Sequence, residues 1–102
     1  MNATLYLPQQ PPRPVPCNGL SIPDPNTGLA QVPEQVPALL GCASELVDVL
    51  ASGLGYVAYS VFDHEGEINL AAMNAVASVS GVAFSLDDED SILRGPVLVV
   101  KH

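Results

Sequence analysis

The stretch that decides the fold is residues 56–62, Tyr-Val-Ala-Tyr-Ser-Val-Phe, read together with residues 95–100, Gly-Pro-Val-Leu-Val-Val. In residues 56–62, Val57, Tyr59 and Val61 fall on one side, and this alternation is typical of a strand. Residues 97–100 are apolar on both sides, which predicts a strand buried inside a sheet. Pro96 stands at the start of this strand, where its missing N–H costs no hydrogen bond to a neighbouring strand.

A helix is predicted between these two strands. Its apolar positions recur with helical spacing at Leu70, Met73, Val76 and Ala77. Asn69 precedes them as a plausible N-cap, and Gly81 follows them as a stop.

Residues 39–50 fit two structures. Leu39, Leu40, Ala43, Leu46, Val47 and Leu50 would form one face of a long helix. The β-branched pair Val47 and Val49, the interruption at Gly41 and a glycine-rich stretch at 51–55 favour a strand that turns back into residues 56–62. We predict a short helix over 34–40, a strand over 45–50 and a hairpin loop over 51–55.

Nine of the ten prolines lie in residues 8–37. Residues 4–7 are a strand candidate, and residues 8–16 should run extended without donating a ladder of hydrogen bonds. This segment could be a docking peptide for an aromatic groove, but a stiff loop strapped over the domain is favoured. Turn formers between residues 20–22 and 29–32 suggest a short hairpin.

These elements predict a single α+β domain over residues 1–102. Residues 1–37 form its irregular, proline-rich part, and residues 38–102 form an α+β core. We expect a small, mainly antiparallel sheet with one or two short helices on a face.

The charge restricts the partners. Eleven acidic residues stand against three basic ones, a net charge of −8. Such a surface repels phosphate, so direct binding to nucleic acid or to an anionic membrane is disfavoured. A basic protein surface, a metal ion or no partner remains, and solubility is the favoured explanation of the charge.

Cys17 and Cys42 have no metal-ligand or redox spacing. The chain carries no recognisable export signal and no apolar run near the ~20 residues of a membrane span. We expect a cytoplasmic protein with reduced thiols.

Two acidic groups are the candidate binding residues. They are Asp63, Glu65 and Glu67 in one group and Asp87, Asp88, Glu89 and Asp90 in the other. The first group fails the helix-loop-helix calcium pattern, because its glycine is fourth rather than sixth. Either group is also explained as a solvated loop. His64 lies beside the first group, but no nucleophile signature accompanies it.

Residues 37–100 resemble a family of small proteins of unknown function that phages, plasmids and some bacterial genomes encode. The matching pieces, in order, are Leu39-Leu40-Gly41, Asp63-His64-Glu65-Gly66, Asn74-Ala75-Val76-Ala77 and Ile92-Leu93-Arg94-Gly95-Pro96-Val97. The resemblance implies a strand at 45–50, a mobile-element origin and a helix that opens at Asn74. It carries no catalytic residues.

We therefore expect a non-enzymatic binding protein without cofactor or metal. Its acidic face, residues 87–90 with 63–67, would meet a basic surface of a host protein, such as a nucleic-acid-handling or defence protein that it inhibits. The alternatives are an assembly protein that self-associates through a sheet edge, as in a homodimer, and an enzyme or small-ligand binder whose site the sequence does not reveal.

Overall fold

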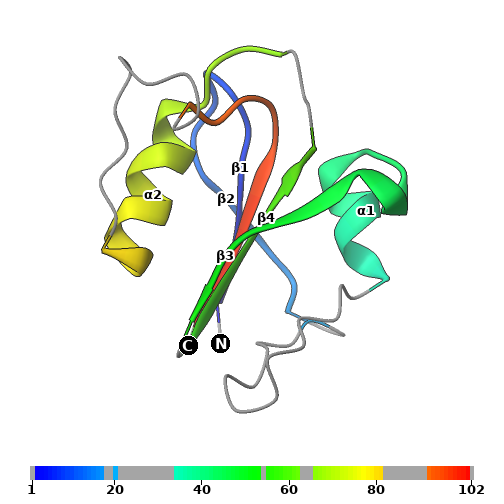
Figure 1. Ribbon diagram of the computed structural model, residues 1–102, viewed down its shortest axis with the longest axis horizontal. Helices are drawn as coiled ribbons and strands as arrows, with labels where there is room; N and C mark the ends of the chain where they lie inside the picture. Colours follow the sequence, from blue (N-terminus) through cyan, green and yellow to red (C-terminus); the bar gives the residue numbers. More distant parts are fainter. Residues whose placement is uncertain are drawn as a thin grey trace.

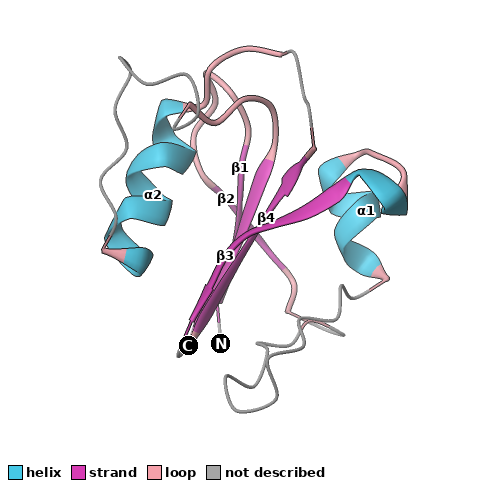
Figure 2. Ribbon diagram, in the orientation of Figure 1, coloured by secondary structure: helices cyan, strands magenta, loops and turns pink. Residues whose placement is uncertain are grey.

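Five strands form one antiparallel sheet in the order β2-β1-β5-β4-β3, within the part of the chain that the structure describes. This computed structural model describes residues 2–17, 20, 34–53, 55–62, 66–81 and 92–101. The elements, in chain order, are β1 (Asn2–Tyr6), β2 (Arg13–Val15), α1 (Gln35–Leu40), the 3₁₀ turn η1 (Ser44–Leu46), β3 (Val47–Gly53), β4 (Tyr56–Val61), α2 (Leu70–Ser80) and β5 (Val97–Lys101). The α+β class with a small antiparallel sheet is confirmed (Figures 1 and 2).

The last strand in sequence, β5, lies at the centre of the sheet. It pairs with β1 on one side and β4 on the other, and residues 97–100 are all buried. An apolar run on both faces is what such a position requires, because each face of the sheet is covered. The sequence prediction of a buried strand is confirmed.

The helices cover opposite faces of the sheet, which Figure 1 shows nearly edge-on. Val36 and Leu40 of α1 pack with Tyr59 in one hydrophobic cluster, the α1-side core. Met73 and Val76 of α2 pack in a second cluster, the α2-side core. The sequence led us to expect helices on a face, and the structure adds that each face has its own.

Strand β3 settles the ambiguity over residues 39–50 in favour of a short helix followed by a strand. It runs to Gly53, so most of the expected hairpin loop belongs to the strand. A β-carbon at Gly53 would lie 2.5 Å from the ring of Tyr56, so any larger residue there would require the Tyr56 ring to move. The register shifts between Val49 and Ala51, which marks a β-bulge.

Helix α2 begins and ends where its sequence predicts. The Asn69 side chain accepts a hydrogen bond from the Ala72 N–H at 3.1 Å, and Gly81 ends the helix at φ +76°. The helix start at Asn74 that the family resemblance implied is wrong, since Asn74 is an exposed residue inside α2.

The proline-rich segment differs from its prediction in one respect. Residues 13–15 are strand β2, paired with β1 from Ala3↔Val15 to Leu5↔Arg13. The expectation that this whole segment forms no ladder is wrong, because an edge strand tolerates proline where the N–H faces outward. The expected hairpin over 20–32 lies outside the described residues, except for the buried Leu20.

Candidate functional site

Most of the predicted acidic face lies outside the described residues. Residues 63–65 and 87–90 fall there, so the grouping of the two acidic segments stays a prediction. Glu67 is described and exposed, and its backbone C=O accepts a hydrogen bond from the Gly95 N–H at 3.1 Å. The Glu67 carboxylate is therefore in contact with solvent, while its backbone is held by a hydrogen bond.

Within the described ranges, no group of three or more His, Cys, Asp or Glu side chains could hold a metal ion. Cys17 and Cys42 are not joined in a disulfide, and each is half-buried against the α1-side core. None of the helices in the described part of the chain has the length and apolar character that a membrane crossing needs.

The two edges of the sheet differ in what they offer to another strand. A proline in a paired strand keeps the ladder only if it faces outward, so Pro14 of β2 faces away from β1. Pro12 and Pro16 flank β2, two residues to either side of Pro14. None of these prolines has an N–H, so this edge cannot donate to an added strand.

At the opposite edge, no strand among the described residues pairs with the outer side of β3. The Phe62 N–H donates to the Leu46 C=O at 2.7 Å, which extends the β3–β4 register by one pair. Residue pairs in an antiparallel ladder alternate between hydrogen-bonded and non-hydrogen-bonded. The N–H and C=O of Asp48 therefore point toward β4, while those of Val47 and Val49 point away from it. The Val47 N–H is taken by the Ser44 C=O. The outward groups are therefore the Val47 C=O and both groups of Val49.

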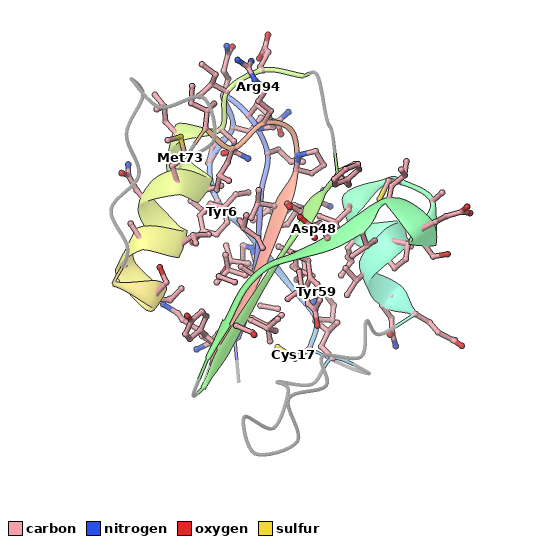
Figure 3. All side chains as sticks on the ribbon, viewed as in Figure 1. Tyr6, Cys17, Asp48, Tyr59, Met73 and Arg94 are labelled. Atoms are coloured by element: carbon pink, nitrogen blue, oxygen red, sulfur yellow. The ribbon has the colours of Figure 1, made fainter. Side chains whose placement is uncertain are left out.

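Apolar and acidic side chains surround these open groups. Phe62 is 64% exposed and Leu46 42% exposed, and the hydrogen bond between their backbones holds them together. Glu45 and Asp48 are exposed on η1 and β3, and neither β3 nor β4 contains a lysine or arginine. Figure 3 shows Asp48 on the ribbon of β3. We call Glu45, Leu46, Asp48, Phe62 and the outward backbone of Val47 and Val49 the β3 edge site.

Asn69 and Tyr59 carry buried polar groups elsewhere in the described part of the chain. The Asn69 side chain is 1% exposed, donates to the Tyr6 C=O at 2.9 Å and the Gly95 C=O at 2.7 Å, and caps α2. Both N–H groups and the oxygen of its amide therefore have hydrogen-bond partners within the fold. Tyr59 is fully buried, its hydroxyl has no hydrogen-bond partner, and burial raises its pKa above 10.0.

Sequence reasoning missed the β3 edge site because composition does not reveal strand order. Glu45 and Asp48 are isolated acids, less conspicuous than the runs at 63–67 and 87–90. One signal was present. Proline at alternate positions 12, 14 and 16 indicates an edge strand that cannot accept another strand. An added strand would therefore have to pair at the opposite edge of the sheet.

Comparison with known proteins gives no further assignment. No protein-family model, no curated protein and no solved structure matches this chain. The resemblance of residues 37–100 to a family of mobile-element proteins therefore stays a prediction.

Proposed function

We propose that this protein is a non-enzymatic protein-binding module whose β3 edge site pairs with an extended basic segment of a partner protein. The observation that supports the proposal is the open backbone at Val47 and Val49, flanked by exposed apolar and acidic side chains. Strand addition to a sheet edge is a common way in which domains recognise peptides, since the main chain gives affinity and the side chains give specificity.

The partner segment would lie antiparallel to β3. One of its residues would exchange both backbone hydrogen bonds with Val49, and an N–H two residues away would donate to the Val47 C=O. Lysine or arginine side chains of the partner would lie near Glu45 and Asp48. An apolar side chain of the partner would cover Leu46 and Phe62.

The net charge of −8 supports the choice of a basic partner. Distributed acidic charge accelerates the encounter with a basic surface more than it holds the complex together. The acidic segments 63–67 and 87–90 would act in this way. A host protein that handles nucleic acid carries such a basic surface. Inhibition of such a protein, including a defence protein, in the cytoplasm is the particular role that we propose.

The second candidate is self-association of two copies through the same edge. A two-fold antiparallel pairing near Asp48 would bring the Asp48 carboxylates of both copies close together, and Glu45 would add to the repulsion. Two chains of net charge −8 also repel each other at long range. Charge complementarity therefore favours a basic partner over a second copy.

Amide hydrogen exchange tests the proposal with defined probes. One probe is an extended peptide of alternating lysine and valine, and the other replaces each lysine by glutamate. In the free protein the Val49 N–H should exchange rapidly, because it faces solvent from an edge strand. The lysine peptide should protect this N–H, and its affinity should fall as added salt screens the charges. The glutamate peptide should give no protection.

Matched charge variants locate the contact. Glu45→Gln with Asp48→Asn should weaken the lysine peptide by roughly threefold to tenfold, since close charge pairs at partly exposed sites contribute about 1 kcal/mol. Asp87→Asn with Asp88→Asn changes the net charge equally and should mainly slow association. No protection of Val49 at any peptide concentration would exclude the edge. Protection in concentrated protein without peptide would instead establish the self-association alternative.

A further inference from the structure

A small pocket lies on the other half of the molecule, between the C-terminal half of α2 and strands β1 and β5. Its volume is about 130 Å³. Thr4 and Tyr6 of β1, two residues apart, contribute from the sheet face that α2 covers. Figure 3 shows Tyr6 between the sheet and α2. The pocket shares no residue with the β3 edge site.

Small residues on α2 leave this space unfilled. At the N-terminal half of the helix, Met73 and Val76 pack into the α2-side core. Ala75 and Ser78, about one turn apart on the same helix, line the pocket together with Val79. The short side chains of Ala75 and Ser78 fill less space between the helix and the sheet than Met73 does, and a pocket is left beside them.

The pocket has an apolar side and a polar side. Ala75, Val79 and Val99 supply the apolar surface. Among the residues that line the pocket, the remaining ones are Thr4, Tyr6, Ser78 and Lys101, with three hydroxyls and one ammonium. Within the described part of the chain, no hydrogen bond or ion pair of these side chains is present, so they are available to a ligand.

The charge of the pocket selects its ligand. Lys101 is the only lysine in the chain and one of only three basic residues, and none of the described residues that line the pocket is acidic. An ammonium with neighbouring hydroxyls donates hydrogen bonds to a carboxylate. A single positive charge on a chain of net charge −8 neutralises a monoanion better than a dianion.

The size of the pocket restricts the ligand further. A dry cavity of about 150 Å³ in another protein accepts benzene, which has six carbon atoms. A pocket of about 130 Å³ therefore suits roughly six non-hydrogen atoms. We propose that this pocket binds a small aliphatic monocarboxylate. Its carboxylate lies against Lys101 and the hydroxyls, and its alkyl chain lies against Ala75, Val79 and Val99.

Butyrate, with six non-hydrogen atoms, is the probe. Titration to tens of millimolar, followed by NMR, should shift the signals of Ala75, Ser78 and Lys101 along one saturable curve. Sodium chloride at equal ionic strength controls for salt. Butyramide has the same shape without charge and should bind more weakly. Butylamine, which brings a second positive charge to Lys101, should not bind.

Two variants separate the polar and apolar contributions. Lys101→Gln should weaken butyrate by about fivefold to tenfold and remove its advantage over butyramide, because charge-assisted hydrogen bonds are roughly twice as strong as neutral ones. Arg13→Gln, in the neighbouring strand β2 and paired with Leu5 of the α1-side core, lies on the opposite face of the sheet; it removes an equal charge and should leave butyrate binding unchanged. Ala75→Leu should fill the pocket and abolish binding of both probes.

The variants also define what would overturn the proposal. Leucine is a good helix former, so Ala75→Leu should keep the fold, which thermal unfolding verifies. Butyrate shifts that persist in a folded Ala75→Leu variant would place the ligand elsewhere. Shifts that never saturate, or that fall equally in Lys101→Gln and Arg13→Gln, would show that the pocket holds only water and that butyrate acts as a general counterion.

Discussion

Asn69 joins three parts of the fold, and its replacement measures how much these contacts stabilise the domain. Its side-chain N–H groups donate to Tyr6 in β1 and to Gly95, just before β5, while its oxygen caps α2. Asn69→Ala removes a helix cap, at a cost of about 1 kcal/mol. It also leaves the buried Gly95 C=O without this donor, at a cost of about 1–3 kcal/mol.

The half-buried Tyr6 C=O also loses its donor, which adds a smaller cost. Together these losses should lower the free energy of unfolding by roughly 3–5 kcal/mol. Domains of this size have about 5–15 kcal/mol in total, so the variant should be close to unfolding at physiological temperature. Urea denaturation measures the change as a lower midpoint at unchanged slope. Asn74→Ala, on the exposed side of the same helix, is the matched control and should change stability by less than about 0.5 kcal/mol.

Asn69→Asp separates the cap from the two donated bonds. The aspartate keeps an acceptor for the Ala72 N–H but presents a carboxylate to two carbonyl oxygens, which should raise its pKa. The folded state would then hold a proton that the unfolded state has lost, so this variant loses stability as pH rises through the ordinary aspartate value of about 4. At neutral pH it should be no more stable than Asn69→Ala. An Asn69→Asp variant as stable as wild type at neutral pH would refute the donor role.

Three further predictions follow from the core. Tyr59→Phe removes a buried hydroxyl without a partner and should stabilise the protein by about 1 kcal/mol. Because burial raises the pKa of Tyr59, the unfolded chain ionises first, so wild type should lose stability above about pH 10 and the variant should lose less. Val100→Asp should prevent folding, since Val100 is fully buried in the central strand, whereas Lys101→Asp should still fold by circular dichroism. Mass spectrometry of unreduced protein should find Cys17 and Cys42 without a disulfide, and a two-hydrogen deficit would contradict the structure.

The elements that sequence predicted correctly are those whose signals are local. Residues 97–100, apolar on both faces, could only be a buried strand. The cap at Asn69 and the stop at Gly81 gave the ends of α2, because capping depends on residues within one turn. The family resemblance displaced that start to Asn74, and the local physical signal was the better guide.

What the sequence did not reveal depends on contacts between distant segments. The two carbonyls that Asn69 bonds lie 63 and 26 residues away along the chain, and no local pattern marks them. Strand β2 was missed because a proline is compatible with a strand only at an outward position, which requires knowing that β2 lies at an edge. The β3 edge site is hidden for the same reason.

The β-bulge after Val49 determines how strong an interaction at the β3 edge can be. It shifts the register between Val49 and Ala51, and a bulge bends and twists the strand that carries it. A flat partner strand therefore stays in register only along residues 47–49. This limit prevents indiscriminate edge-to-edge pairing, which a long flat edge would invite. With so few backbone bonds, the proposed complex would depend on the flanking charges for its rate of formation and on Leu46 and Phe62 for its lifetime. A transient, salt-sensitive interaction is what this geometry supports.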